Sequence, residues 1–324
     1  MNDGLMLPVS RLRHITGFIT TYGEEADPRV SVFARIWHVQ RVAFVARRLH
    51  DRLESLDRSR IERLVWWHDL NRWPFAHNSE RGNFDQAENV REYFSSLPGC
   101  TERDMLDLYG IHKKDPTTLT QEAQIVLVAD LLAGIVEDPV MAVAGLNVHP
   151  RFIPREVEGL LGFSLCKDPW RVKCADLAAE LHGGPHPSPE GFQVRLRTLF
   201  AELVEEILNT HWRKDPAATM ATFIDIAGAV RNSFISPVIF PLNNEKVCHA
   251  SWLRHEVIPW YLENIYDARR RLLVIDERTF VADVIGIPGS PYASDHFRPD
   301  LGYVSREEPA MAFIHPGTTA KPVS

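Results

Sequence analysis

The side chains best suited to chemistry are histidines and aspartates spread over the first half of the chain. His38, the adjacent pair His68 and Asp69, and Asp130 supply imidazoles and carboxylates, which are ligands of divalent transition metals in proteins. If helices bring these side chains together, they bind one metal ion and leave positions open for water and a phosphate oxygen. The first hypothesis is therefore a metal centre that acts on a phosphoester.

Helices predicted from hydrophobic periodicity carry these residues. Residues 31–53 have apolar side chains at helical spacing, and His38 lies on that apolar face, because Val42 and Val45 follow it by one and two helical turns. A second predicted helix, 58–69, carries the His–Asp pair near its end. These patterns turn His38 toward the interior.

Two further predicted helices complete the first half. Residues 80–97 form one that ends at Pro98–Gly99. Thr118 with Gln121 is typical of a capping box, and it opens the apolar segment QEAQIVLVADLLAGIVED, which is expected to end before Pro139. Asp130 lies in the middle of this segment, flanked by apolar residues.

The same residues also have structural interpretations. A histidine on an apolar helix face is more often a hydrogen-bonded core residue than a ligand. Asp130 is predicted to be buried, and a buried carboxylate needs a cation, either a metal or an arginine such as Arg35 or Arg41. The residue pattern alone leaves both alternatives open.

The order and surroundings of the candidate ligands resemble a known family. His38, His68–Asp69 and Asp130 resemble the His...His-Asp...Asp signature of the HD metal-dependent phosphohydrolase superfamily. The segment HDLNRWPFAHNSE resembles the His-Asp-Leu-Gly-His-x-Pro-Phe-x-His-x-x-Glu segment of its deoxynucleoside triphosphate triphosphohydrolases, the dGTPase-like branch. Arg35, three residues before His38, and EAQIVLVAD agree with that branch, while SRLRHI and YLENIYDARRRL resemble it more weakly.

This resemblance implies an HD-domain helical fold with additional C-terminal helices, and roles for particular residues. The implied metal ligands are His38, His68, Asp69 and Asp130. His77 and Glu80 would be the acid–base pair beside a divalent ion, which is Mn2+, Mg2+, Co2+ or Fe2+. The implied substrate is a deoxynucleoside triphosphate, attacked at the α-phosphorus to release nucleoside and intact triphosphate. Without the resemblance, His77 would be a loop histidine and Glu80 a carboxylate favoured at a helix start.

Departures from the family pattern fall on the expected substrate contacts. Asn71–Arg72 replaces the Gly-His after His-Asp-Leu, and Arg72 is a long, fixed cation that could hold a phosphate. Gly134 stands where the family has a tyrosine, while Asp138 is retained at the next turn. The remaining candidate substrate residues are Arg35, Lys113, Lys114, Tyr266 and Arg269. A solvated basic surface is the alternative for the two lysines and for Arg269.

Composition and charge exclude several classes of protein. With 324 residues and 45% hydrophobic content, the chain can bury the core of one large or two modest domains. Its longest apolar stretch, 125–136, is too short to span a bilayer, and the N-terminus lacks a secretory pattern, so we expect a cytoplasmic protein without a membrane partner. A net charge of −7 argues against strong general nucleic-acid binding. The scattered cysteines fit a reducing compartment.

The predicted organisation is all-α. Residues 1–146 form an HD-type metal-binding catalytic region, and residues 147–189 form an irregular connection with a short helix near 176–181. Residues 190–285 form a C-terminal helical region packed on the first, with helical periodicity at 195–211, 217–234 and 246–273. Residues 286–324 form a mostly irregular tail.

Other functions fit the same candidate site. HD sites also act on other phosphoesters, such as a nucleoside monophosphate or single-stranded nucleic acid. An HD-type di-iron oxygenase needs two further histidine ligands, for which only His77 and His112 are available. A non-catalytic nucleotide-sensing module would use the site for binding alone and would not need the pair His77 and Glu80. The resemblance also suggests a homo-oligomer.

Overall fold

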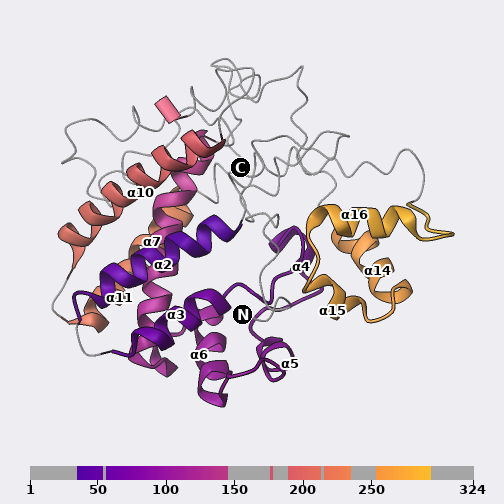
Figure 1. Cartoon of the computed structure of the whole chain (residues 1–324), viewed down its shortest axis with the longest axis horizontal. Coiled ribbons are helices and arrows are strands. Elements are labelled where there is room, and N and C mark those ends of the chain that lie inside the picture. Colours follow the sequence, from indigo (N-terminus) through magenta and orange to yellow (C-terminus); the bar gives the residue numbers. More distant parts are fainter. Residues whose placement is uncertain are drawn as a thin grey trace, which may run out of the picture.

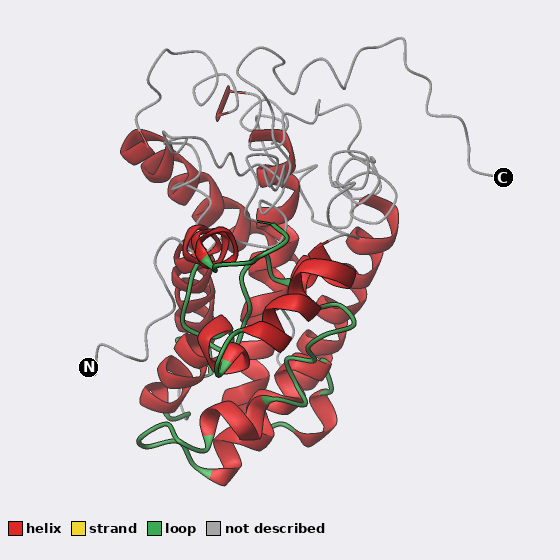
Figure 2. Ribbon diagram, turned by 90° about the vertical axis from the view of Figure 1, so that its right-hand side faces the viewer, coloured by secondary structure: helices red, strands yellow, loops and turns green. Residues whose placement is uncertain are grey.

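The computed structural model describes residues 35–53, 56–144, 176–177, 189–212, 215–234 and 253–292. Within these ranges the chain is made of helices, turns and loops, without a strand (Figure 2). The predicted all-α fold is therefore confirmed for the described part. No helix in that part combines the length and apolar character needed to cross a bilayer. The segment SRLRHI, most of the predicted connection and most of the predicted tail lie outside the described residues.

The larger hydrophobic core is built around α7 (Gln121–Ala144), which contacts five other helices (Figure 1). These are α2 (Arg35–His50), α3 (Arg58–Trp67), α6 (Glu102–Lys113), α10 (Pro189–His211) and α11 (Pro216–Val230). Periodicity explains the packing, because Val42, Val45 and Leu49 recur on one face of α2 and are all buried. α7 is buried on nearly every side between Ile125 and Val136, as expected for a helix surrounded by others.

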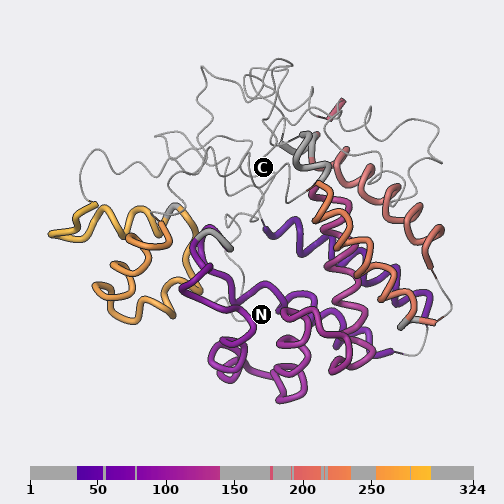
Figure 3. Tube along the Cα trace, turned by 180° about the vertical axis from the view of Figure 1, so that it is seen from behind, coloured from indigo at the N-terminus to yellow at the C-terminus, as the bar shows by residue number. Residues whose placement is uncertain are grey.

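A smaller core gathers the C-terminal helices at one side of the molecule (Figures 1 and 3). Its elements are the π-helical turn η5 (Leu253–Val257), α14 (Ile258–Asn264), α15 (Ala268–Leu272) and α16 (Glu277–Gly286). Trp73 and Phe75, from the loop before the one-turn helix α4 (His77–Glu80), are fully buried in this core. The loop after α3 thus packs with a part of the chain that is far away in sequence.

Side-chain caps set several helix starts. Asp57 accepts the Arg60 N–H at the start of α3, and Asp276 accepts the Thr279 N–H at the start of α16. Thr101 and Asp104 form a reciprocal capping box at the start of α6. Each cap satisfies an amide that has no acceptor within its own helix. The caps therefore fix where α3, α6 and α16 begin.

The ends of α7 differ from the prediction. Thr120, not Thr118, precedes the helix, and its Oγ1 accepts the Ala123 N–H, whereas Thr118 ends the short 3-10 helix η1 (Pro116–Thr118). The predicted end before Pro139 is also wrong, because α7 continues to Ala144. Proline disfavours a helix interior because it removes one backbone N–H. Tertiary packing of a long helix can outweigh this local preference against helix.

The predicted helix 80–97 is interrupted. α4 ends at Glu80, Gly82 has a φ of +88°, and helical structure resumes only in α5 (Val90–Phe94). Glycine adopts this left-handed conformation without steric cost, so it ends the turn here. α6 was not predicted; of its apolar side chains only Leu108 and Ile111 are buried, and its other buried residues are Asp104, Asp107 and Gly110.

The C-terminal helices follow their predicted periodicity more closely. The predicted helices at 195–211 and 217–234 correspond to α10 and α11, and a π-helical turn at 231–234 follows α11. α10 starts earlier than predicted, at Pro189, a residue type that suits the first turn of a helix. The predicted helix at 246–273 is broken in its described part, where Asp267 has a φ of +52° between α14 and α15.

Candidate metal centre

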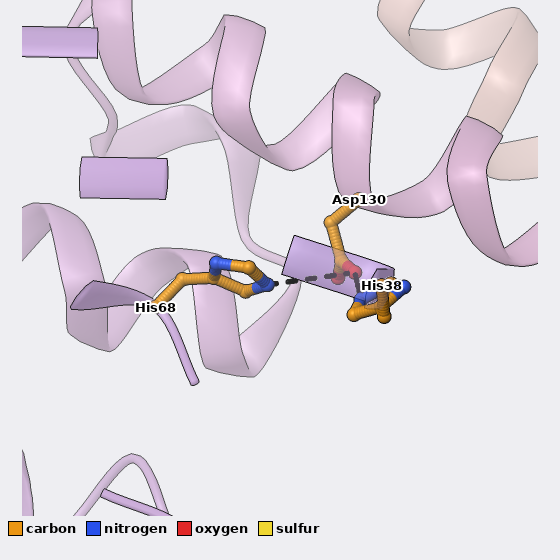
Figure 4. A group of neighbouring side chains, drawn as sticks. All are labelled: His38, His68 and Asp130. Atoms are coloured by element: carbon orange, nitrogen blue, oxygen red, sulfur yellow. Dashed lines mark hydrogen bonds and ion pairs between the residues drawn. The ribbon is translucent and has the colours of Figure 1, made fainter. Parts of the chain in front are cut away.

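Three helical segments bring His38, His68 and Asp130 together. Their ligand atoms lie within 4.8 Å of one another, and the two imidazoles approach the Asp130 carboxylate from α2 and from the end of α3 (Figure 4). Asp130 Oδ1 is 3.1 Å from His38 Nε2 and 3.8 Å from His68 Nε2. Both imidazoles are buried. Three of the four predicted ligands therefore form one compact group of a kind that binds divalent metals.

Asp130 is less buried than predicted. Its side chain is 28% exposed, compared with 3% for His38 and His68, so the group is open on the carboxylate side. Desolvation raises the pKa of Asp130. Its hydrogen bond with His38 and the nearby His68 lower the pKa by more than this, so the net shift is downward. Asp130 is therefore ionised at neutral pH and is accessible to a ligand from solvent.

His68 is oriented as a metal ligand would be. Its Nδ1 lies 2.6 Å from the Val65 carbonyl oxygen, which only accepts hydrogen bonds, so Nδ1 carries the proton and Nε2 presents a lone pair. Nε2 is buried and has no hydrogen-bond partner in the described part of the chain. A buried acceptor without a donor costs free energy. A cation at this position would satisfy it.

His38 meets a second carboxylate on its other nitrogen. Nδ1 lies 2.7 Å from Glu137 Oε2, and Glu137 also accepts a hydrogen bond from Arg41 Nε. Nε2 lies 3.1 Å from the Asp130 oxygen, so with Nδ1 donating to Glu137 the hydrogen bond to Asp130 needs a second proton, on Nε2. Two acceptors at this separation require a cation between them, either a proton or a metal ion. A carboxylate on the outer nitrogen is the usual support of a metal-binding histidine.

Asp69, the fourth predicted ligand, borders this group. Its Oδ2 lies 3.6 Å from His68 Nε2 and 3.9 Å from His38 Nε2, and it also accepts a hydrogen bond from Arg35 at 2.6 Å. Its Oδ1 accepts a hydrogen bond from Arg72 at 3.3 Å. Desolvation raises the pKa of Asp69, but the positive charge of Arg35, followed by His68 and Arg72, holds it well below its ordinary value.

The predicted alternative partners of Asp130 bind other carboxylates. Arg35 contacts Asp69, and Arg41 contacts Glu137. Arg35 is buried, and its Nε and Nη2 have no hydrogen-bond partner among the described residues. Buried guanidinium donors of this kind favour an anion nearby.

Glu80 is connected to the centre through Arg72. Its Oε2 accepts a hydrogen bond from Arg72 Nη1 at 2.8 Å, and its Oε1 accepts the Trp73 N–H at 3.0 Å. Burial lowers the pKa of Arg72, but the charges of Glu80 and Asp69 raise it above its ordinary value. The guanidinium therefore bridges a candidate ligand and the candidate acid–base carboxylate. The side chain of His77, the other predicted member of that pair, lies outside the described residues.

The other predicted substrate residues lie in varied settings. Lys113 is part of a surface cluster with Asp85 and Glu88, at 3.0 and 3.1 Å, which fits the solvated-surface alternative. Lys114 is exposed at the end of α6. Tyr266 is 96% exposed between α14 and α15, and Arg269 is exposed on α15. Asp138 is half-buried, and it is its neighbour Glu137 that reaches His38.

His112 supports the backbone of the site. Its Nε2 lies 2.7 Å from the carbonyl oxygen of His68 and donates to it, and its Nδ1 is not among the ligand atoms that gather with His38, His68 and Asp130. Burial lowers the pKa of His112 to about 4. The di-iron alternative would have used His112 as a ligand. Among the described residues, the group of His38, His68 and Asp130 is the one that could hold a metal.

Sequence reasoning missed Glu137 as part of this site and considered Arg41 only as a partner of Asp130. A signal for Glu137 was present, because it follows Asp130 by two helical turns and therefore shares its face of the helix. Arg41 shares a face with His38 for the same reason. Comparisons with protein-family models, with curated proteins and with solved structures gave no match to this chain.

Proposed function

We propose that this protein is a metal-dependent nucleotide phosphohydrolase of the HD type. The observation that carries the proposal is the group of His38, His68 and Asp130, whose ligand atoms lie within 4.8 Å of one another, with the buried Nε2 of His68 making no hydrogen bond among the described residues. His112 Nδ1 and His211 Nε2 are also buried without a hydrogen-bond partner among the described residues, but neither belongs to such a group of ligand atoms. The open side at Asp130 fits a catalytic site, because structural sites are closed by protein ligands.

In the proposed mechanism, His38, His68 and Asp130 would hold a divalent ion (Mn2+, Mg2+, Co2+ or Fe2+), and Asp69, whose Oδ2 lies 3.6 Å from His68 Nε2, would be the fourth ligand. Such an ion polarises a phosphoryl oxygen and makes water acidic enough to attack phosphorus. Glu137 fixes the proton of His38 on Nδ1, and the Val65 carbonyl fixes that of His68. Both Nε2 lone pairs are thereby kept on the side of the metal.

Two arginines are the proposed phosphate ligands. Arg35 is held by Asp69 through one nitrogen and has two buried donors left over among the described residues. Arg72 can exchange Glu80 for a phosphate oxygen, because guanidinium groups bind carboxylate and phosphate with similar geometry. That exchange would release Glu80 to take up a proton beside the substrate. The resemblance of HDLNRWPFAHNSE to the dGTPase-like branch supports a deoxynucleoside triphosphate as the substrate.

The test is a product analysis. The purified protein is incubated separately with each of the four metals and with a panel of deoxy- and ribonucleotides, and the products are identified by mass. We expect nucleoside and intact triphosphate, and we expect none from His68→Ala, which also loses the metal. Cleavage of monophosphates or of single-stranded nucleic acid alone would keep the metal site but refute the triphosphohydrolase assignment. Metal binding without hydrolysis of any compound would favour a nucleotide-sensing module.

A further inference from the structure

We infer that Glu277, which lies on α16 in the C-terminal core, is a positioning residue for Glu80 beside the candidate metal centre. The inference rests on the proposed function. Glu277 acts on the turn formed by Phe75 and Ala76, which leads directly into the segment that carries His77 and Glu80. It holds this turn in a conformation that the local sequence does not favour.

The turn is strained. Phe75 has a φ of +65° and Ala76 a φ of +44°, and neither is glycine. A residue with a Cβ loses free energy in this left-handed region, and such residues persist only where surrounding contacts enforce them. Strained residues of this kind are concentrated at functional sites. The Phe75–Ala76 turn therefore needs external support.

Glu277 provides that support directly. Its Oε1 accepts the backbone N–H of Phe75 at 3.0 Å, and the carboxylate is 3% exposed. An acidic residue in the first turn of a helix ordinarily interacts with the helix dipole from solvent. Burial is costly for a carboxylate, so its place against the turn indicates more than a favourable helix start. Phe280 follows Glu277 by one turn of α16, and its ring packs edge-on against the ring of Phe75, with the two centroids 5.9 Å apart.

From the turn, a continuous set of contacts leads to the metal centre. The Ala76 carbonyl accepts the N–H groups of Ser79 and Glu80, which fixes the start of α4. The Glu80 carboxylate then accepts the Trp73 N–H and binds Arg72, whose Nε reaches Asp69. The views in Figures 1 and 3 both place α4 beside the C-terminal helices. Glu277 thus fixes the position of Glu80 without touching the metal site.

The experiment compares three variants of the full-length protein. Glu277→Ala removes the acceptor, and Glu277→Gln keeps an amide oxygen for the Phe75 N–H. Asp276→Ala is the matched control. It removes the side chain that caps α16, next to Glu277 in the sequence, but leaves the hydrogen bond from the Phe75 N–H to Glu277. Each variant is measured for hydrogen exchange of residues 73–80, Co2+ affinity, melting temperature, and kcat and KM with the nucleotide that the wild type hydrolyses.

We expect Glu277→Ala to accelerate exchange in residues 73–80 by about tenfold or more, the effect of losing a hydrogen bond to a charged acceptor. Its kcat should fall about 10²-fold, the usual cost of misplacing a reacting group by about 1 Å, while KM and Co2+ affinity stay unchanged. Glu277→Gln should restore both exchange and kcat. Asp276→Ala should lower the melting temperature but not kcat.

Three results would overturn the inference. These are unchanged exchange in Glu277→Ala, faster exchange with an unchanged kcat, and an equal loss of kcat in Asp276→Ala, which would indicate general instability of the C-terminal core. A wild type that hydrolyses no nucleotide with any metal would instead refute the proposed function. The exchange measurement would then decide alone whether Glu277 holds the turn.

Discussion

The affinity of the site for a divalent metal should fall when Glu137 is changed. Glu137 is 1% exposed, and its Oε2 lies 2.7 Å from His38 Nδ1. Removing an outer carboxylate of this kind weakens metal binding roughly 10- to 100-fold, which is about 1.4 to 2.7 kcal/mol of binding free energy. Glu137→Ala should lie near the larger value, because it also removes the carboxylate that Arg41 contacts. Glu137→Gln should lie near the smaller value, because an amide oxygen can still accept from His38.

The assay is a titration of each metal-free variant with Co2+, followed by its visible absorption, together with calorimetry using Mn2+. Circular dichroism and thermal unfolding without metal show whether each variant is folded. Glu205→Gln is the control, because it removes the α10 partner of Arg48, which lies on α2 about 15 Å along the helix axis from His38. We expect this control to bind metal like the wild type.

Three outcomes would refute the reasoning about Glu137. If both variants fold and bind Co2+ as tightly as the wild type, Glu137 does not support His38 as a ligand. If Glu205→Gln weakens binding equally, the affinity reports the packing of α2 rather than the orientation of the imidazole. An unaltered Co2+ spectrum in Glu137→Ala would likewise contradict a change in how His38 is presented.

Three further changes have expected outcomes. Arg72→Ala should raise KM for the nucleotide more than it weakens metal binding, and an unchanged KM would exclude a phosphate contact. Desolvation raises the pKa of Asp104, but hydrogen bonds from Thr101 and Arg60 lower it below its ordinary 3.8. The stability contributed by Asp104 is therefore present above about pH 4 and is lost as the pH falls through the lower folded pKa, so Asp104→Asn should flatten the acid limb of unfolding followed by circular dichroism. Leu132→Ala, at a fully buried position of α7, should cost about 2 to 5 kcal/mol in urea denaturation.

The sequence was informative where the signal is local. The periodicity of α2 placed His38 on its inward face, and the structure brings His38 and Asp130 beside His68. Glu137 was missed because the two neighbouring acids, Glu137 and Asp138, both follow Asp130 at plausible spacing. Only the position of α2 decides which of them contacts His38.

The contact between Phe75 and Glu277 had no local signal. The two residues are 202 positions apart, and the left-handed backbone at Phe75 runs against the preference of its own side chain. The pattern WPFAH reads as an ordinary turn with a proline. Such a conformation arises from tertiary contacts, so residue types at that position cannot reveal it.

The division of the site between two hydrophobic cores sets the order in which it can mature. His38, His68 and Asp130 are all present once α7 has been synthesised, whereas Glu277 follows α7 by more than a hundred residues. At ordinary rates of translation that interval is on the order of ten seconds. A nascent chain can therefore gather its candidate metal ligands before Glu277 is available to hold the segment that carries Glu80. A nonsense mutation between α11 and α16 would leave a truncated product that retains these ligands but lacks the acceptor for Phe75.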